Sequence, residues 1–186
     1  MNKKRANETS SDGDLLELLR KGDEDAFLIL YRRHQASIFR FALHMSGSRE
    51  VAEEITQDVF LAMIKDPKRY TEALGSLQPY LIGMARNQVR QQLRRNRPFV
   101  WEEIEQAGIS PEEEMSRDEQ VRILRTAILS LPPNYREVVV LCDLEGEDYG
   151  QAAAVLHCAV GTVRSRLHRA RSILQAKLRR RERCPA

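Results

Sequence analysis

The sequence predicts an all-α fold in which an acidic linker joins two small helical domains. Glycine and proline are sparse, at 9 and 7 of 186 residues, and runs of β-branched residues are few, which favours helices. Apolar residues recur three and four positions apart along most of the chain, with no alternating pattern typical of strands. Between residues 99 and 119 the composition changes to eight acids and one base, which indicates a linker between two domains.

The first domain is expected to be a four-helix module. Caps, glycines and one proline set the expected limits of its helices, at Gly22, Asp23, Gly47, Ser48, Pro79 and about Asn96. The third helix carries an i, i+4 stripe that leaves its opposite face exposed, formed by Val51, Ile55, Val59 and Met63.

The second domain is expected to begin at a capping box formed by Ser116 and Glu119. That helix ends before Leu131, and three more follow, over about 134–145, from Asp148 to near Leu156, and from Val160 into the basic tail. The expected divisions of the chain are a disordered lead (1–13), an N-terminal domain (14–97), the acidic linker (98–115), a C-terminal helix-turn-helix domain (116–182) and a tail (183–186).

Several classes of protein are excluded by composition and motifs. No stretch approaches the roughly 20 apolar residues that span a bilayer, and no secretory signal follows the basic N-terminus, so we expect a cytoplasmic protein without membrane insertion. Cys142, Cys158 and Cys184 match no metal-binding spacing and are expected to be free thiols. We find no phosphate-binding loop, no nucleophile paired with a base and no ligand cluster, and expect neither catalysis, cofactor nor metal.

The helix that starts near Pro79 carries one cationic face. No acid occurs between residues 72 and 102, and arginines four residues apart form a ridge that matches the spacing of DNA phosphates. An asparagine on the same face can contact a base edge. The face consists of Arg86, Asn87, Arg90 and Arg94. A solvated arginine face is the alternative interpretation.

The last two helices match a helix-turn-helix pattern. Ala153 is small where two helices cross, His157 lies at the turn, and Val163 returns to the core. The second helix of such a unit enters the major groove with its N-terminal residues against base edges. The exposed candidates there are Arg164, Ser165, His168 and Arg169. A purely structural helical hairpin is the alternative.

Five stretches of the sequence together carry a resemblance to a known family: GDEDAF at 22–27, AEEITQDVF at 52–60, YLIGMARN at 80–87, LPPNYREV at 131–138 and VGTVRSRL at 160–167. With them, residues 14–178 resemble a bacterial sigma factor of the extracytoplasmic-function (ECF) group. The resemblance implies a protein that binds the clamp and flap surfaces of core RNA polymerase and directs it to promoter DNA. It also implies that the linker lies in basic channels of the polymerase, and that an anti-sigma factor is a possible further partner.

The resemblance assigns roles to particular residues. The minus-10 element would be contacted by Lys68, Tyr70, Arg86, Asn87, Arg90 and Arg94. Lys68 and Tyr70 belong to a loop, 65–76, that would capture a flipped base, although Tyr70 can equally anchor the core. The minus-35 element would be contacted by Thr162, Arg164, Ser165, His168 and Arg169. The polymerase clamp would be contacted by Glu54, Gln57 and Asp58.

Some positions depart from the pattern of the family. Gln91 stands where aspartate is common, and His157 stands where glycine is usual, although histidine tolerates a positive φ better than most residues. The segment 148–153 is rich in glycine and alanine, which is expected to weaken the first helix of the helix-turn-helix. Two other classes of protein are alternatives to a sigma factor: a helix-turn-helix DNA-binding regulator that is not a polymerase subunit, and an enzyme.

Overall fold

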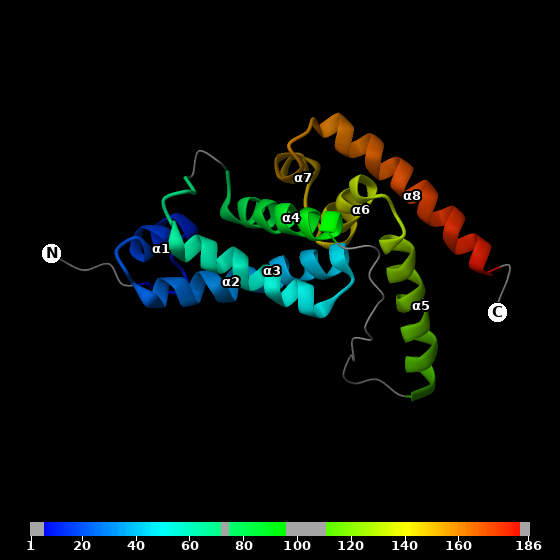
Figure 1. The fold of residues 1–186 in the computed structure, drawn as a ribbon, viewed down its shortest axis with the longest axis horizontal. Helices are drawn as coiled ribbons and strands as arrows, with labels where there is room; N and C mark the ends of the chain where they lie inside the picture. The colour runs from blue at the N-terminus through cyan, green and yellow to red at the C-terminus, as the bar shows by residue number, and fades with distance from the viewer. Residues whose placement is uncertain (1–5, 72–74, 96–110, 183–186) are drawn as a thin grey trace.

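The computed structural model describes residues 6–71, 75–95 and 111–182 of the chain (Figure 1). Within these ranges the backbone forms α-helices, one π-helical segment and no strand, as the all-α prediction requires. None of the described helices combines the length and the hydrophobicity that crossing a membrane would need.

The N-terminal helices form a bundle around α2. They are α1 (Asp12–Leu19), α2 (Glu24–Ser46), α3 (Arg49–Lys65) and α4 (Leu77–Arg95). Asp23 and Ser48 accept hydrogen bonds from backbone N–H groups in the first turns of α2 and α3, so both predicted caps are confirmed. Helices α1, α3 and α4 all pack against α2 (Figure 1).

The lead that we expected to be disordered through residue 13 is shorter than predicted. Asp12 and Gly13 already belong to α1, and Ser11 caps that helix by accepting from the N–H of Asp14 at 3.2 Å. Arg33 of α2 donates to the carbonyl oxygens of Glu8 and Ser10 at 3.0 and 3.1 Å. These long-range bonds tie the lead to the bundle, and no local pattern of sequence could have shown them. Residues 1–5 lie outside the described range.

The C-terminal helices are α5 (Pro111–Leu129), α6 (Pro133–Val139), the π-helical segment η2 (Val140–Leu144), α7 (Tyr149–Leu156) and α8 (Val160–Glu182). Helix α8 packs on α5, α6 and α7. Helix α5 begins at Pro111, so the predicted start at the Ser116 capping box was wrong. Most of the predicted linker, 98–110, lies outside the described residues.

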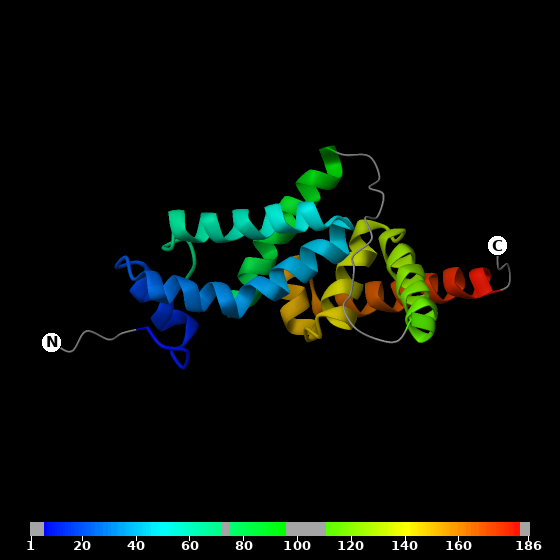
Figure 2. The ribbon, with the colours of Figure 1, turned by 90° about the horizontal axis from the view of Figure 1, so that it is seen from below.

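The two sets of helices pack against each other. Helix α4 contacts α7, while α2 contacts α5, α6 and η2 (Figures 1 and 2). The buried side chains of both sets form one continuous hydrophobic cluster. Gly47, with φ of 80°, ends α2 so close to α5 that a Cβ atom there would lie 2.7 Å from Cδ1 of Leu129. The cationic face predicted on α4 therefore lies near the C-terminal helices.

Candidate nucleic-acid interface

Helix α4 presents only part of its predicted cationic face to solvent. Leu81, Ala85 and Val89, on the side of α4 opposite the cationic face, are buried, and they fix the rotation of the helix. Asn87 and Arg94 are exposed, and the end of α4 that bears Arg94 projects from the body of the molecule (Figure 2). These two side chains are accessible to a nucleic acid in the conformation observed.

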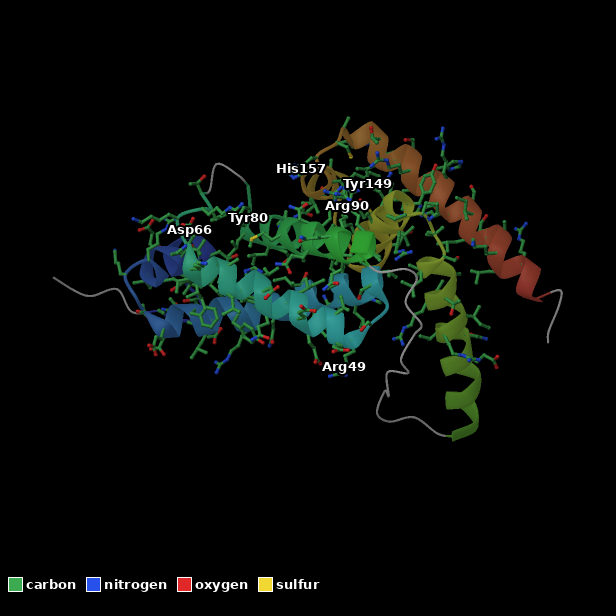
Figure 3. The ribbon with its side chains drawn as sticks, in the orientation of Figure 1. Arg49, Asp66, Tyr80, Arg90, Tyr149 and His157 are labelled. Atoms are coloured by element: carbon green, nitrogen blue, oxygen red, sulfur yellow. The ribbon has the colours of Figure 1, made fainter. Side chains whose placement is uncertain are left out.

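Arg86 and Arg90 are instead held by an acid from the C-terminal helices. Nε of Arg86 donates to Oε1 of Glu137 at 3.0 Å, and Nε of Arg90 donates to the same oxygen at 2.6 Å. Second bonds join Nη2 of Arg86 and of Arg90 to Oε2 at 3.3 and 3.1 Å, and Arg90 also reaches Oδ1 of Asn134 at 2.9 Å. Figure 3 shows Arg90 on the side of α4 that faces these helices.

This pairing corrects the picture of one exposed ridge. Arg86 is only 6% exposed, and Glu137 is completely buried. A buried carboxylate is costly unless it is paired, and the two guanidinium groups provide that pairing. The sequence around α4 lacks acids, but the acid that neutralises the ridge lies 51 residues after Arg86.

The helix-turn-helix predicted in the C-terminal half is confirmed as a backbone arrangement. Helix α7 ends at Leu156 and is followed by His157, whose φ of 52° is the positive value expected at this turn, and α8 begins at Val160. Ala153 and Val163 are buried where the two helices pack. Figure 3 shows His157 at the end of α7 next to the start of α8.

The first helix of this unit has a strong N-terminal cap that the sequence analysis missed. Oδ1 of Asp148 accepts from the N–H groups of Gly150 and Gln151 at 2.7 and 2.9 Å, and the Gln151 side chain accepts from the Asp148 N–H at 3.2 Å. This reciprocal capping box offsets the low helix propensity of glycine. The signal was present in the D-x-x-Q spacing.

The outer face of α8 carries the residues that the helix-turn-helix pattern singled out. Arg164, Ser165, His168 and Arg169 are exposed, and Thr162 is half-buried. The guanidinium of Arg164 lies 5.7 Å from the ring centre of Tyr149, close enough for a cation–π contact that orients it. These side chains line one accessible face, which an Arg and a Ser can use to contact base edges.

The loop before α4 is described at both ends but not at residues 72–74. Lys68 is exposed, whereas the Tyr70 ring is buried 5.2 Å from the ring of Tyr80. The Tyr70 hydroxyl donates to the carbonyl of Gly75 at 2.6 Å, which links the two ends of the loop. In this conformation Tyr70 is therefore a core anchor. Arg20, which the sequence analysis did not select, donates to the carbonyls of Pro67 and Tyr70 at 3.2 and 2.8 Å.

Helix α3 exposes the acidic and polar residues predicted to meet a protein partner. Glu54, Gln57 and Asp58 all lie on its solvent side. Beside them is a groove of about 670 Å³ between α2 and α3, which the sequence analysis missed. Its apolar lining includes Phe27, Tyr31, Phe39, Phe60, Leu61 and Ile64. Leu61 is 53% exposed. Apolar residues of α3 that lie outside its buried stripe could have indicated this groove from the sequence.

The described residues offer no arrangement for metal binding. Among them, no group of three or more His, Cys, Asp or Glu side chains could hold an ion. Burial and the nearby Asp143 raise the pKa of the Cys142 thiol to about 11, so that it stays protonated and is a poor nucleophile at neutral pH.

Family models match both halves of the chain. The model for Sigma-70 region 2 matches residues 30–99, and the model for Sigma-70, region 4 matches residues 122–174. The first match includes α3 and α4, and the second includes the helix-turn-helix.

Relatives and solved structures agree with these matches. ECF RNA polymerase sigma factor SigC of Mycobacterium tuberculosis is 32% identical over 180 residues, covering 90% of this chain and 94% of its own. SigE of Mycolicibacterium smegmatis is 31% identical over 153 residues, which are 78% of this chain and 59% of that relative. Similar solved structures are CnrH in complex with the cytosolic domain of CnrY (TM-score 0.71, 25% identity, 91% and 97% coverage) and the sigma factor RpoE with the anti-sigma factor NepR from Bartonella quintana (TM-score 0.67, 25% identity, 82% and 96% coverage). The chain therefore belongs to the ECF family of RNA polymerase sigma factors.

Proposed function

We propose that this protein binds core RNA polymerase and directs it to promoters by contacting both a minus-10 and a minus-35 element. The observation that carries the proposal is that the matches to sigma-70 regions 2 and 4 contain two arginine-bearing helices, α4, on which Arg94 is exposed, and α8, on which Arg164 and Arg169 are exposed. A helix-turn-helix regulator that is not a polymerase subunit needs only α8 to bind DNA. That alternative does not account for the match of residues 30–99 to sigma-70 region 2.

The minus-10 element is assigned to α4 and the loop before it. Asn87 and Arg94 are exposed and can make the first contacts, whereas Arg86 and Arg90 must first leave Glu137. Lys68 can pair with a phosphate at the loop. Tyr70 supports the loop from beneath through its bond to Gly75.

The minus-35 element is assigned to the N-terminal half of α8. Arg164, Ser165, His168 and Arg169 face the groove in this proposal, and Thr162 lies at its edge, near the first turn. Arginine that contacts guanine in a bidentate manner supplies the largest share of discrimination. We assign that contact to Arg164, whose guanidinium lies over the ring of Tyr149.

The polymerase is assigned to the exposed surface of α3 and its groove. Glu54, Gln57 and Asp58 offer complementary charge and hydrogen bonds to a basic clamp surface, while the apolar groove provides an area to bury. Residues 102–114 add six acids for a basic channel of the polymerase, and the flap would hold the C-terminal helices.

Once bound, the two DNA-contacting modules act together. Holding both at a fixed separation makes the second contact intramolecular, which raises affinity without new contacts. The polymerase carries out the chemistry, so this chain is assigned no catalytic role and works in the cytoplasm beside the enzyme. Solved relatives are complexes with anti-sigma factors or a cytosolic domain, and we include an anti-sigma factor among the expected partners.

The test is transcription in vitro from fragmented host DNA, with purified core polymerase and with or without this protein, followed by sequencing of the 5′ ends. New start sites that share an upstream motif would support the proposal. A folded protein with active core polymerase and no new start sites would contradict it. The variant Arg164→Ala should lose starts that depend on the minus-35 motif, and Arg32→Ala, an exposed arginine on α2, is its control.

A further inference from the structure

The contact between the N-terminal and C-terminal helices has a consistent distribution of charge. Three ion pairs cross it among the described residues, and in each the arginine comes from the N-terminal helices and the acid from the C-terminal helices. Two of them join Arg86 and Arg90 to Glu137, and the third joins Nη2 of Arg40 to Oε2 of Glu145 at 2.8 Å. Charge complementarity of this kind selects one docking geometry.

The centre of this contact is the Glu137 carboxylate. Its two oxygens accept four hydrogen bonds from two guanidinium groups, and no part of the residue reaches solvent. An anion that accepts bidentate bonds from two arginines occupies them in the way that a phosphate group would. The same two arginines are those assigned above to the minus-10 element.

Further polar contacts between the two sets of helices surround the Glu137 carboxylate. Gln78 of α4 donates to Oε1 of Glu147 at 2.7 Å, and Arg40, on the rim of the contact, keeps 53% of its side chain exposed. Buried ion pairs contribute little net stability compared with their hydrated states, because both charges regain water when they separate. The charged pairs therefore select the closed arrangement but add little to the free energy of opening, which is set mainly by the apolar side chains that the two sets of helices bury together.

We propose that Glu137 is an internal competitor of DNA, which closes the C-terminal helices over α4 and keeps Arg86 and Arg90 from the minus-10 element until the two modules separate. This inference rests on the proposed function for the identity of the competing ligand. Binding to the polymerase, which would hold the modules apart, is then also the step that releases the two arginines. The closed protein binds single-stranded DNA weakly because only its open fraction is competent.

The test uses the full-length chain without polymerase. Glu137→Gln keeps the size of the side chain and removes its charge, which leaves two cations unpaired in the closed form. Asp143→Asn is the matched control, because it makes the same charge change in the C-terminal helices but disrupts only a pair with Arg171 of the same module. Small-angle scattering measures the radius of gyration, and anisotropy measures binding to a fluorescein-labelled 20-nucleotide single strand of randomised sequence.

We expect Glu137→Gln to have a larger radius of gyration and to bind the single strand about tenfold more tightly than the control. Adding Arg90→Gln to it should remove most of the gain, because the released arginines make the new contacts. Equal radius and affinity in Glu137→Gln and the control would overturn the inference, and so would opening without tighter binding.

A second variant keeps the inference testable if Glu137→Gln loses its helical circular dichroism. Glu145→Gln breaks only the pair with Arg40. The Glu145 side chain is only 1% exposed, but glutamine keeps its size, and the variant should change both readouts in the same direction by a smaller amount. No change would overturn the inference. Transcription with core polymerase is measured separately. If the wild-type protein starts no transcripts, the proposed function fails, while scattering and strand binding still decide whether Glu137 closes the molecule.

Discussion

Arg136 connects the ends of two helices, and replacing it should cost a large part of the stability of the protein. Its guanidinium donates from Nη1 to the carbonyl of Met45 at 2.6 Å, and from Nη2 to those of Leu129 and, at 3.1 Å, Leu131. Met45 lies in the last turn of α2, and Leu129 is the last residue of α5. A cation at these two C-termini pairs with carbonyl groups that have no donor within their own helices.

The expected magnitude follows from these bonds and from the cost of burying the group. Bonds from a charged donor contribute about 1.5 kcal/mol each at the lower end of their range, or about 4–5 kcal/mol for three. Burial opposes this gain: it lowers the pKa of Arg136, and its Nε is a buried donor with no partner among the described residues. For Arg136→Met we therefore expect a net loss of about 3 kcal/mol in the free energy of unfolding.

Urea unfolding followed by circular dichroism measures this loss. In a chain of this size it corresponds to a melting temperature lower by about 6–12 °C. The control is Arg122→Met on α5, whose exposed side chain pairs with Glu119 at 3.7 Å and should contribute under about 1 kcal/mol. A loss below about 1 kcal/mol for Arg136→Met would refute the reasoning, because it would mean that water satisfies the carbonyls equally well.

Three further predictions concern pH, capping and DNA. Burial, with Arg125 and Arg40 nearby, lowers the pKa of His44 below 6.5 in the folded protein, so the stability contributed by the neutral ring is complete above pH 6.5 and is lost as the pH falls towards the folded-state pKa. Urea midpoints measured from about pH 7 to about pH 5 should therefore fall less in His44→Gln than in the wild-type protein, and equal slopes would contradict this. Asp148→Ala should cost about 1–2 kcal/mol in urea unfolding, and an unchanged midpoint would exclude the capping role. Arg164→Ala should weaken minus-35 binding by about 1–3 kcal/mol, roughly five- to 150-fold, in anisotropy with the motif found by transcription; unchanged binding would refute that contact.

Local patterns in the sequence were sufficient for most of the fold. The caps Asp23 and Ser48, the stop at Gly47 and the turn at His157 each depend on a few neighbouring residues, and the structure has all four where the sequence placed them. The predicted start of α5 at Ser116 was wrong because a serine and a glutamate three residues apart also occur inside helices, as Ser116 and Glu119 do here. The π-helical segment Val140–Leu144 had no local signal, since its residues continue the apolar pattern of α6.

The candidate site was predictable only as far as its residues depend on their own helix. The spacing of Arg86 and Arg90 identified one face of α4, but the partner of that face lies 47 and 51 positions further along the chain. Arg136 was missed for the same reason, because the Met45 carbonyl that it contacts is 91 positions away. Contacts of this length are set by how the modules pack, which no helical period encodes.

The pairing of Arg86 and Arg90 with Glu137 explains how the absence of acids around α4 affects DNA binding. With no acid between residues 72 and 102, the two arginines have no carboxylate on their own helix to compete with DNA. The neutralising group comes from a module that is able to move, so the charge of α4 depends on conformation instead of being fixed by sequence. An acid within α4 would weaken DNA binding in every state, whereas Glu137 weakens it only in the closed one. The same two side chains can then stabilise the closed protein and contact the promoter when it is open.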